Sequence, residues 1–571
     1  MKRLLKYLKP YTKECILGPF GKLCEATLEL IVPLVIAAII DRGIGNGDTG
    51  FIWGMVGVLC LLGILGLGFS IFAQYFSAKA AVGFVTSVRH SLYEHIQTLS
   101  YNDVDKLGTS TIITRMTTDA SRVQSGLNLA LRLLLRSPFV VFGAMIMAFT
   151  IDPSAGGVFG LVIPLLSVVV FGIMIITMPM YKCVQSGVDK ILGRTRSNLG
   201  GVRVIRAFGA ENGEVEDFRN ENQALTVAQK RAGHISALLG PMTYVIINLG
   251  ILLLIYTGAL KVESGDLTQG QVIALYNYMS QILIELIKLA NMIISISKAL
   301  ASASRISSIF DIKSSQRFGE LSRGACDEFA VEFDNVALKY ASSSENAIEG
   351  VSFKVRKGET IGIIGGTGSG KSTLVNLIPC LYDATAGTVS IYGAPVNEYS
   401  REFLIEKIGI VPQRAVLFSG SVRDNLNFAT NASDDELLEA LKTACADDFI
   451  LAKGGLDARV EAGGKNFSGG QRQRLTIARA LVKKPEILIL DDSASALDYA
   501  TDASLRKSIA SCADNLTVFI VSQRSASVMN ADKIIVLDDG EAVGIGTHSE
   551  LLEGCEVYRE IYDSQFRREA V

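Results

Sequence analysis

Six long apolar stretches occupy the first 300 residues, and they constrain the fold more than any other feature of this 571-residue chain. Each has about 20 residues or more, enough for a helix to cross the ~30 Å hydrocarbon core of a bilayer. The charged start MKRLLKYLKPYTK resembles a signal peptide, but the apolar run after it is too long and no small-residue cleavage site ends it. The first half is therefore predicted to be a helical membrane domain. The stretches lie at about 15–40, 51–76, 131–151, 155–178, 235–260 and 270–298.

Lysine and arginine are distributed unevenly between the connecting segments. Nineteen lie in the N-terminal tail and in the long segments 77–130 and 179–234, whereas the short loops on the other side hold two. Because positive residues favour cytoplasmic loops, both termini and both long segments are predicted to be cytoplasmic. Apolar residues recur at helical spacing in the long segments, so the membrane helices are predicted to extend into the cytoplasm and to turn near 100–108 and near 208–218.

Three acidic residues within the predicted spans are candidates for a substrate cavity. Glu25 and Glu29 share a helix face at i, i+4, and Glu285 shares one with Lys288 at i, i+3. Ionisable side chains are costly in lipid, so they are expected to face a wet cavity or a partner helix. Contact with a polar or cationic substrate and structural pairing are both open at this point.

The composition fits a chain that lives partly in lipid and partly in water. Apolar residues make up 49% and charged residues 20%, below the roughly 25% typical of soluble domains. The net charge of −2 argues against a nucleic-acid binder, and the apolar content excludes disorder. The nine cysteines form no CxxC pair, so they are interpreted as reduced or buried thiols rather than as disulfides or a zinc site.

The second half changes character, because short β-branched runs alternate there with amphipathic segments. This pattern is typical of an α/β domain with buried strands. The predicted fold class is a multidomain membrane protein, an all-α six-helix transmembrane domain followed by an α/β P-loop domain. The predicted boundaries are 1–300 for the membrane domain, 301–325 for a linker and 326–571 for the P-loop domain.

A phosphate-binding loop is the clearest motif of the second half. The segment GGTGSGKS matches G-x-x-x-x-G-K-[ST] and lies between an apolar strand and a helical run. Its glycines let backbone N–H groups close on phosphate oxygens, Lys371 reaches the terminal phosphates, and Ser372 can ligate Mg²⁺. Downstream, the strand ILILDD ends in Asp491, suited to the magnesium shell. The predicted loop contacts are Gly365, Gly366, Thr367, Gly368, Ser369, Gly370, Lys371, Ser372 and Thr373.

The segment NFSGGQRQRL, which begins at Asn466, resembles the signature of ATP-binding-cassette (ABC) proteins. With six spans before one cassette, the whole chain resembles an ABC exporter half-transporter. The resemblance implies ATP and Mg²⁺ as cofactors, with Ser372, Gln413 and Asp491 around the metal. The predicted turns near 100–108 and 208–218 resemble the coupling helices of the family. The segment GVRVIRAFGAE (201–211) is similar to the family's second-loop sequence.

The resemblance further implies how nucleotide is shared between two subunits. Tyr340 stands where an aromatic ring stacks on adenine, Gln413 is the Q-loop residue, and Ser495 to Asp498 form the D-loop. In this family two cassettes sandwich ATP head to tail, so the signature of one subunit completes the site of the other. A helix N-terminus at the signature would attract the γ-phosphate. The signature residues concerned are Ser468, Gly469, Gly470 and Gln471.

Two positions depart from the family pattern. Most ABC proteins carry glutamate after the metal-binding aspartate, whereas this chain has Asp492, whose carboxylate is about 1.5 Å closer to the backbone. Where the family has a histidine after the next strand, this chain has Gln523, which cannot carry a proton or a positive charge. Since positioned acid–base groups contribute roughly 10²–10⁴-fold in rate, this site is predicted to bind ATP but to hydrolyse it slowly.

The degenerate site resembles that of one chain of a heterodimeric, multidrug-type ABC exporter. The expected partner is a non-identical half-transporter that carries the competent glutamate and histidine and a damaged signature; the alternative is a homodimer in which Asp492 works slowly. The expected mechanism is export of an unknown small or amphipathic substrate by alternating access, in a bacterial plasma (inner) membrane. An importer of the same architecture and a nucleotide-gated regulator are the alternatives, whereas six spans exclude a soluble ABC protein.

Overall fold

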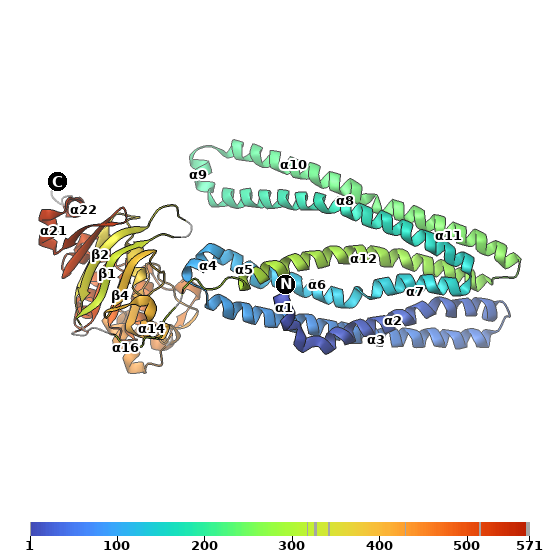
Figure 1. The fold of residues 1–571 in the computed structure, drawn as a ribbon, viewed down its shortest axis with the longest axis horizontal. Helices are drawn as coiled ribbons and strands as arrows, with labels where there is room; N and C mark the ends of the chain where they lie inside the picture. The colour runs from blue at the N-terminus through green and yellow to red at the C-terminus, as the bar shows by residue number, and fades with distance from the viewer. Residues whose placement is uncertain are drawn as a thin grey trace. The chain divides into compact units, whose positions relative to one another are not determined.

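The computed structural model describes residues 2–316, 318–324, 328–340, 343–428, 430–512 and 515–566. The chain forms two compact units (Figure 1). The first, helical unit comprises Met1–His95 and Ser110–Asp311, and the second comprises Ile96–Thr109 and Ile312–Val571. A short stretch from the first half of the sequence therefore belongs structurally to the second unit. Eight cysteines within the described residues are free thiols, and Cys326 lies outside those residues.

Six helices are long and apolar enough to cross a membrane, and each contains one of the six predicted stretches. This confirms the predicted all-α membrane domain. Several of these helices are far longer than a bilayer needs, because the apolar part continues into an amphipathic extension. The six run over Arg3–Ile44, Thr49–Gln97, Thr109–Ile151, Pro153–Gly200, Glu211–Glu263 and Gln269–Phe310.

Two of the long helices, α8 and α12, begin with capping residues that are visible in the sequence. The Asp152 carboxylate accepts a hydrogen bond from the Ala155 backbone N–H at 2.8 Å ahead of α8, and Thr268 and Gln271 form a capping box at the start of α12. The segments are α1 (Lys2–Leu5), η1 (Lys6–Tyr11), α2 (Thr12–Ala38), η2 (Ile39–Ile44), α3 (Thr49–Gln97), α4 (Tyr101–Leu107), α5 (Thr109–Thr114), η3 (Arg115–Asp119), α6 (Ala120–Leu133), α7 (Arg136–Ile151), α8 (Pro153–Gly200), α9 (Val202–Ala207), α10 (Glu211–Ala237), α11 (Leu239–Glu263) and α12 (Gln269–Phe310).

Helix α12 is central to the packing of the first unit. It packs against α2, α6, α7 and α11, whereas α8 runs side by side with α10 and α11 (Figure 1). Tyr278 is fully buried in the core around α12, and its hydroxyl donates to the Leu30 carbonyl at 2.6 Å. The helix continues to Phe310, ten residues into the segment that was predicted to be a linker.

Both tips of the extended helices fall within the segments predicted for them. The first tip is α4, which lies within the predicted segment 100–108. The second is the turn at residues 208–210, at the start of the predicted segment 208–218; it follows the short helix α9, and the long helix α10 already begins at Glu211. Gly209, with a φ of +62°, ends α9, and the acidic residues Glu211 and Glu214 favour a helix start.

The second unit contains two main β-sheets. A four-stranded antiparallel sheet has the order β2-β1-β4-β5, and a six-stranded sheet has the order β12-β11-β3-β10-β9-β6. In the latter, β11, β3, β10, β9 and β6 are parallel and only β12 is antiparallel. The strands are β1 (Phe329–Leu338), β2 (Ile348–Arg356), β3 (Thr360–Gly365), β4 (Ala386–Ile391), β5 (Ala394–Pro395), β6 (Ile408–Val411), β7 (Gly420–Ser421), β8 (Arg459–Val460), β9 (Ile487–Asp491), β10 (Thr517–Val521), β11 (Lys533–Asp538) and β12 (Glu541–Gly546).

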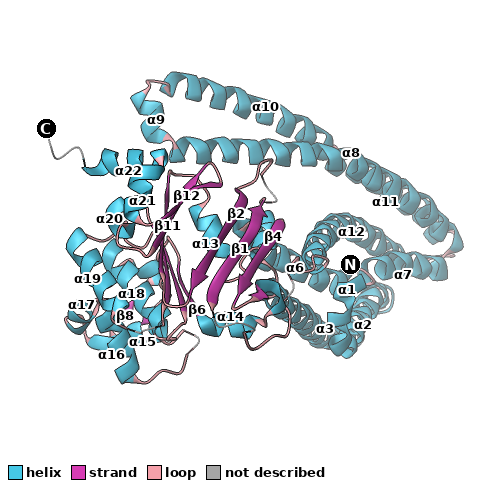
Figure 2. Ribbon diagram, turned by 60° about the vertical axis from the view of Figure 1, so that its left-hand side comes forward, coloured by secondary structure: helices cyan, strands magenta, loops and turns pink. Residues whose placement is uncertain are grey.

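The six-stranded sheet is buried on both faces, which explains its continuous apolar strands. Phe519 faces one hydrophobic core, and its neighbours Val518 and Ile520 face the other. Figure 2 shows the helices α15–α19 gathered on one side of the strands. The helices are α13 (Lys371–Leu377), η4 (Val396–Glu398), α14 (Arg401–Lys407), α15 (Val422–Leu426), α16 (Asp434–Thr443), α17 (Asp447–Leu451), η5 (Gly455–Asp457), η6 (Ala462–Gly464), α18 (Gly469–Leu481), α19 (Tyr499–Ala510), α20 (Ser525–Val528), α21 (His548–Gly554) and α22 (Glu556–Phe566).

Candidate functional site

The phosphate-binding loop connects β3 to α13, as the sequence pattern predicts. Gly368 and Gly370 have φ angles of +89° and +91°, a backbone region that side chains disfavour. A Cβ at Gly370 would lie 2.5 Å from the Ala347 carbonyl oxygen, so no larger residue fits there. A Cβ at Gly366 or Gly368 would have no heavy atom within 4 Å. The loop is therefore closed toward the protein and open on its other side, as a phosphate cradle requires.

Lys371 is held inside this loop. Its side chain is buried, and its ammonium group donates to the Gly365 carbonyl at 3.0 Å, to the Ser369 hydroxyl at 3.3 Å and to the Gly366 carbonyl. Burial lowers the pKa of Lys371, although the nearby Asp492 and Asp491 carboxylates act in the opposite direction. A buried cation whose partners are mainly neutral oxygens attracts an anion.

The hydroxyl and the carboxylate expected around Mg²⁺ lie together. The Ser372 hydroxyl donates to the Asp491 carboxylate at 2.9 Å. Burial raises the pKa of Asp491, with the Ser372 hydrogen bond opposing it. The described residues contain no group of three or more His, Cys, Asp or Glu side chains suited to a metal. This sparse oxygen set fits Mg²⁺, which binds through one or two protein oxygens, water and substrate phosphates.

The two residues that depart from the family pattern lie at the carboxyl ends of adjacent strands. Asp491 pairs with Val521 across β9 and β10, and the Asp492 backbone N–H donates to the Val521 carbonyl at 3.0 Å. Asp492 has a φ of +47° and accepts a bond from the Gln413 amide at 3.3 Å. Gln523 is exposed two residues beyond β10. The fold thus brings Asp492 and Gln413 together, and places Gln523 at the same edge as Asp491.

Gln413 contacts Asp492 rather than the Ser372–Asp491 pair. Within the described residues it forms no hydrogen bond to Ser372 or Asp491, although the family pattern puts all three around the metal. The structure brings only Ser372 and Asp491 of this predicted trio into direct contact. A role for Gln413 at Mg²⁺ remains a prediction.

The signature residues open helix α18. Ser468 is the N-cap, and its hydroxyl and Gln471 form a capping box. Phe467, which replaces the family leucine, is buried in the core with its ring 6.3 Å from that of Phe449. In the part of the chain that is described, no hydrogen bond joins the signature to the P-loop residues. Its free N-terminal turn is therefore available to a ligand outside this chain's own loop.

The D-loop is tied to both the signature and the catalytic position. Its Ser495 hydroxyl donates to the Asp492 carbonyl at 2.8 Å, and a Cβ at Gly470 would lie 2.9 Å from the Ala496 carbonyl oxygen. Asp498 caps α19 by accepting from the Thr501 backbone N–H at 2.9 Å. These contacts join the loop after β9 to the start of α18 as one compact corner.

The predicted adenine-stacking residue Tyr340 is half-buried beside the P-loop helix. Its hydroxyl donates to the Thr373 hydroxyl at 3.1 Å, and its ring meets that of Tyr382 edge-on at 5.2 Å between centroids. Burial raises the pKa of the Tyr340 phenol. In turn, the Tyr382 hydroxyl donates to the Asp105 carboxylate of α4 at 2.7 Å. The first tip, α4, is thus linked to the edge of the P-loop site within the second unit.

Sequence reasoning missed two residues at the edges of the site, and the first of them holds the segment after β10. Gln565 of α22 donates to the Gln523 carbonyl at 2.8 Å and accepts from the Ser525 backbone N–H at 2.9 Å. Tyr382, which connects Tyr340 to α4, was also not singled out. Gln565 is 42 residues from Gln523, and no local motif marks either residue, so only the tertiary structure reveals them.

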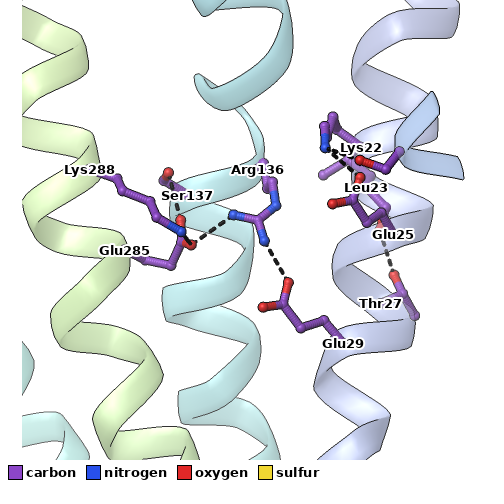
Figure 3. A network of polar contacts seen from close by, with 10 residues as sticks. Lys22, Leu23, Glu25, Thr27, Glu29, Arg136, Ser137, Glu285 and Lys288 are labelled. Atoms are coloured by element: carbon purple, nitrogen blue, oxygen red, sulfur yellow. Dashed lines mark hydrogen bonds and ion pairs between the residues drawn. The ribbon is translucent and has the colours of Figure 1, made fainter. Parts of the chain in front are cut away.

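The three candidate acids of the membrane helices are all paired (Figure 3). Arg136 at the start of α7 donates to Glu285 of α12 at 2.7 Å and to Glu29 of α2 at 2.5 Å. Glu285 also accepts from Ser137 and from Lys288, each at 2.9 Å, and Glu25 accepts from Lys22 at 2.5 Å. The contacts support structural pairing, while a role in substrate contact remains a prediction.

Comparison with known families identifies both halves of the chain. The family described as "ABC transporter transmembrane region" matches residues 15–286, and the family described as "ABC transporter" matches residues 348–495. The two matches correspond to the helical unit and to the unit that carries the P-loop.

Relatives match the chain from end to end. An uncharacterized ABC transporter ATP-binding protein of Mycobacterium tuberculosis is 36% identical over 98% of this chain and 97% of its own length. An uncharacterized ABC transporter ATP-binding protein of Bacillus subtilis, YfiB, is 34% identical over 100% of this chain and 99% of its own. The ATP-dependent lipid A-core flippase of Blochmanniella pennsylvanica is 27% identical over 99% of this chain and 97% of its own.

Proposed function

Because the chain belongs to the ABC transporter family, with the exporter-type arrangement of a membrane domain before an ATP-binding cassette, we propose that it is the degenerate-site subunit of a heterodimeric exporter. In this proposal its own site binds ATP and Mg²⁺ through Lys371, Ser372 and Asp491 but hydrolyses ATP slowly. Its signature completes the productive site of a non-identical partner that supplies glutamate and histidine.

One observation carries this proposal: the residues that bind ATP are all present in this site, whereas the two residues expected to support hydrolysis are replaced. The lysine, the serine and the metal-binding aspartate are buried or hydrogen-bonded where phosphate and Mg²⁺ would need them. At the hydrolysis positions, Asp492 reaches less far than a glutamate and Gln523 is exposed and cannot hold a proton. Loss of positioned acid–base groups costs roughly 10²–10⁴-fold in rate while leaving binding intact.

The cycle follows from these assignments. ATP brings the two cassettes together, α4 and α9 carry the motion to the membrane helices, and the partner's hydrolysis resets the transporter. The Tyr382–Asp105 bond of 2.7 Å supports the first of these links. The proposed site of action is a bacterial plasma membrane with both termini in the cytoplasm, and the substrate is a small or amphipathic molecule. The relation to a lipid A-core flippase supports an amphipathic one.

The test compares the rate of ATP hydrolysis by the purified chain with that of a variant in which the family's glutamate and histidine are restored. The double variant Asp492→Glu, Gln523→His is expected to hydrolyse ATP about 10²-fold faster than the unchanged chain, because both acid–base positions are restored. Equilibrium ATP binding is expected to stay within about 3-fold, since neither residue holds the P-loop. Phe467→Leu serves as the matched control, because it restores a family residue that lies in the core rather than at the site. Brisk hydrolysis by the unchanged chain alone would contradict the proposal.

A further inference from the structure

A groove of about 660 Å³ lies between the η3–α6 segment and α12. Its lining contains five hydroxyl side chains and the cations Arg122 and Lys298, and it contains no acidic residue. The floor is formed where the two helices touch, since a Cβ at Gly126 would lie 2.2 Å from the Ala299 Cβ. Arg122 on one helix and Lys298 on the other therefore line one narrow, hydroxyl-rich cleft.

The cations of this groove differ from other cations of the membrane helices. Arg122 and Lys298 are exposed, and neither forms a hydrogen bond or an ion pair with any described residue. Arg136 and Lys288, in contrast, are neutralised by Glu29 and Glu285. A positive field thus remains on this face after internal pairing is complete.

The depth of the groove suits a lipid head group. From Gln269 to Ser295, α12 rises about 39 Å at 1.5 Å per residue. This exceeds the ~30 Å hydrocarbon core but lies within the ~40–45 Å that includes the head groups. A helix that enters the membrane near its first residue therefore places the groove at the head-group level of the leaflet toward which its C-terminal end points.

We propose that this groove binds a phosphate-like anionic group of the transported substrate. The inference rests on the proposed transport function and deepens it by giving the substrate a charge. Two cations from opposite walls supply charge-assisted hydrogen bonds. The Thr117 and Ser295 hydroxyls already donate to backbone carbonyls, so the hydroxyls that can donate to the remaining oxygens of a phosphate or carboxylate are those of Thr118, Ser121 and Ser125. The neutralised cluster around Arg136 offers no comparable attraction to a cation, which the acids alone had suggested as a ligand.

A simpler reading is that Arg122 and Lys298 only anchor the helices at the membrane interface, as positive residues commonly do. The two readings differ in one respect. Anchoring depends on the number of positive charges near the interface, whereas a binding groove depends on these two positions together.

The experiment measures lipid binding to the purified full-length chain in neutral detergent, by native mass spectrometry and without nucleotide. The probes are short-chain phosphatidic acid, phosphatidylcholine with the same acyl chains, and inorganic phosphate. The unchanged chain is expected to prefer phosphatidic acid. The double variant Arg122→Ala, Lys298→Ala is expected to lose about 10-fold or more of that affinity, with phosphatidylcholine binding unchanged, because two charge-assisted contacts are removed.

Two controls make the result specific. The exchange variant Arg122→Lys, Lys298→Arg keeps both charges and is expected to stay within about 3-fold of the unchanged chain. The variant Arg203→Ala, Lys230→Ala removes two exposed cations elsewhere in the same unit and is expected to bind as the unchanged chain does. An unfolding midpoint is measured for each variant, so that lost binding is not mistaken for lost folding.

Each outcome decides the proposal. A loss of phosphatidic acid binding that is confined to the groove variant supports the proposal. If inorganic phosphate also competes with phosphatidic acid, the ligand is a soluble anion; if it does not compete, the ligand is an anionic amphiphile. Equal affinity of the groove variant and the unchanged chain, or an equal loss in both double-alanine variants, overturns the proposal in favour of anchoring. Because the assay uses neither ATP nor a partner subunit, its failure leaves the degenerate-site proposal standing, and rapid hydrolysis by the chain alone would leave the groove standing.

Discussion

Arg136 and Lys371 are both buried cations with acids nearby, yet their surroundings differ. Arg136 makes short ion pairs with two glutamates from two other helices, so its charge is neutralised within the chain. Lys371 bonds to two backbone carbonyls and a hydroxyl, beside glycines with open space on their outer side. A closed cluster, in which the cation is neutralised by acids as around Arg136, stabilises the fold. An open cluster, in which the cation contacts mainly neutral oxygens as around Lys371, can still bind an anionic ligand, and this difference separates a binding site from a structural element.

The largest expected effect breaks the closed cluster. Arg136→Ala would leave Glu285, whose side chain is 2% exposed, without its arginine. Removing one partner of a buried ion pair costs about 3–5 kcal/mol, so the free energy of unfolding is expected to fall by about that amount. The measurement is thermal or denaturant unfolding of the chain in detergent.

Two further variants test the cause of that loss. Replacing the pair by Arg136→Met with Glu285→Met is expected to recover most of the stability, because no buried charge is then left alone. Lys190→Ala removes an exposed partner of Glu221 and is expected to change stability by less than about 1 kcal/mol. If Arg136→Ala unfolds at the same midpoint as the unchanged chain, the cluster is not the structural element described above.

A smaller effect, with a different readout, is expected at the open cluster. Lys371→Ala removes a charge-assisted contact to phosphate worth about 1.5–3 kcal/mol, so ATP affinity is expected to fall about 10- to 100-fold. Stability is expected to change little, because no buried charge of opposite sign depends on Lys371 alone. Lys442→Ala, an exposed lysine of the same unit, is the control for both measurements. If Lys371→Ala lowered the unfolding midpoint but left ATP affinity unchanged, Lys371 would be a structural residue and not a phosphate-binding one.

The smallest effect is a difference in pH dependence between two aspartates of the second unit. Burial raises the pKa of Asp491, so its ionised form weakens the fold at neutral pH; Asp491→Asn is expected to raise the unfolding midpoint there while weakening Mg²⁺-dependent ATP binding. At Asp103, burial alone would raise the pKa, but hydrogen bonds from Ser100 and Ser315 outweigh it and lower the pKa.

Asp103 therefore contributes stability that is present above its unfolded pKa of about 3.9 and is lost as the pH falls through its lower folded pKa. Asp103→Asn is expected to lower the unfolding midpoint at pH 7, and the difference from the unchanged chain is expected to shrink toward pH 3. Unfolding midpoints at several pH values check both variants. Shifts of the same sign at neutral pH would contradict the assignment.

What could be predicted from the sequence depends on how local the cause is. The six spans follow from runs of apolar residues, and the P-loop follows from a strand, a glycine-rich loop and a helix that are contiguous in the chain. The second tip was predicted only as the broad segment 208–218, because helical periodicity does not show where a helix stops; Gly209 in a left-handed conformation marks the turn itself.

Contacts between distant segments were invisible in advance. The sequence pairs Glu285 only with Lys288 on the same helix, and the structure adds Arg136, 149 residues away, which neutralises the glutamate inside the packed helices. The unpaired state of Arg122 and Lys298 is likewise a property of the packed helices. No periodicity places Gln565 next to Gln523, because their contact depends on how α22 returns to the end of β10.

The compact corner at Gly470, Ala496 and Ser495 has a consequence for communication between subunits. Gly470 of α18 packs against the Ala496 backbone, and the hydroxyl of the adjacent Ser495 donates to the Asp492 carbonyl, so the Ser468 turn and Asp492 are joined by a route of only a few residues. If the signature completes a partner subunit's site, as proposed above, a ligand bound at that site has a short structural route to Asp492 of this chain.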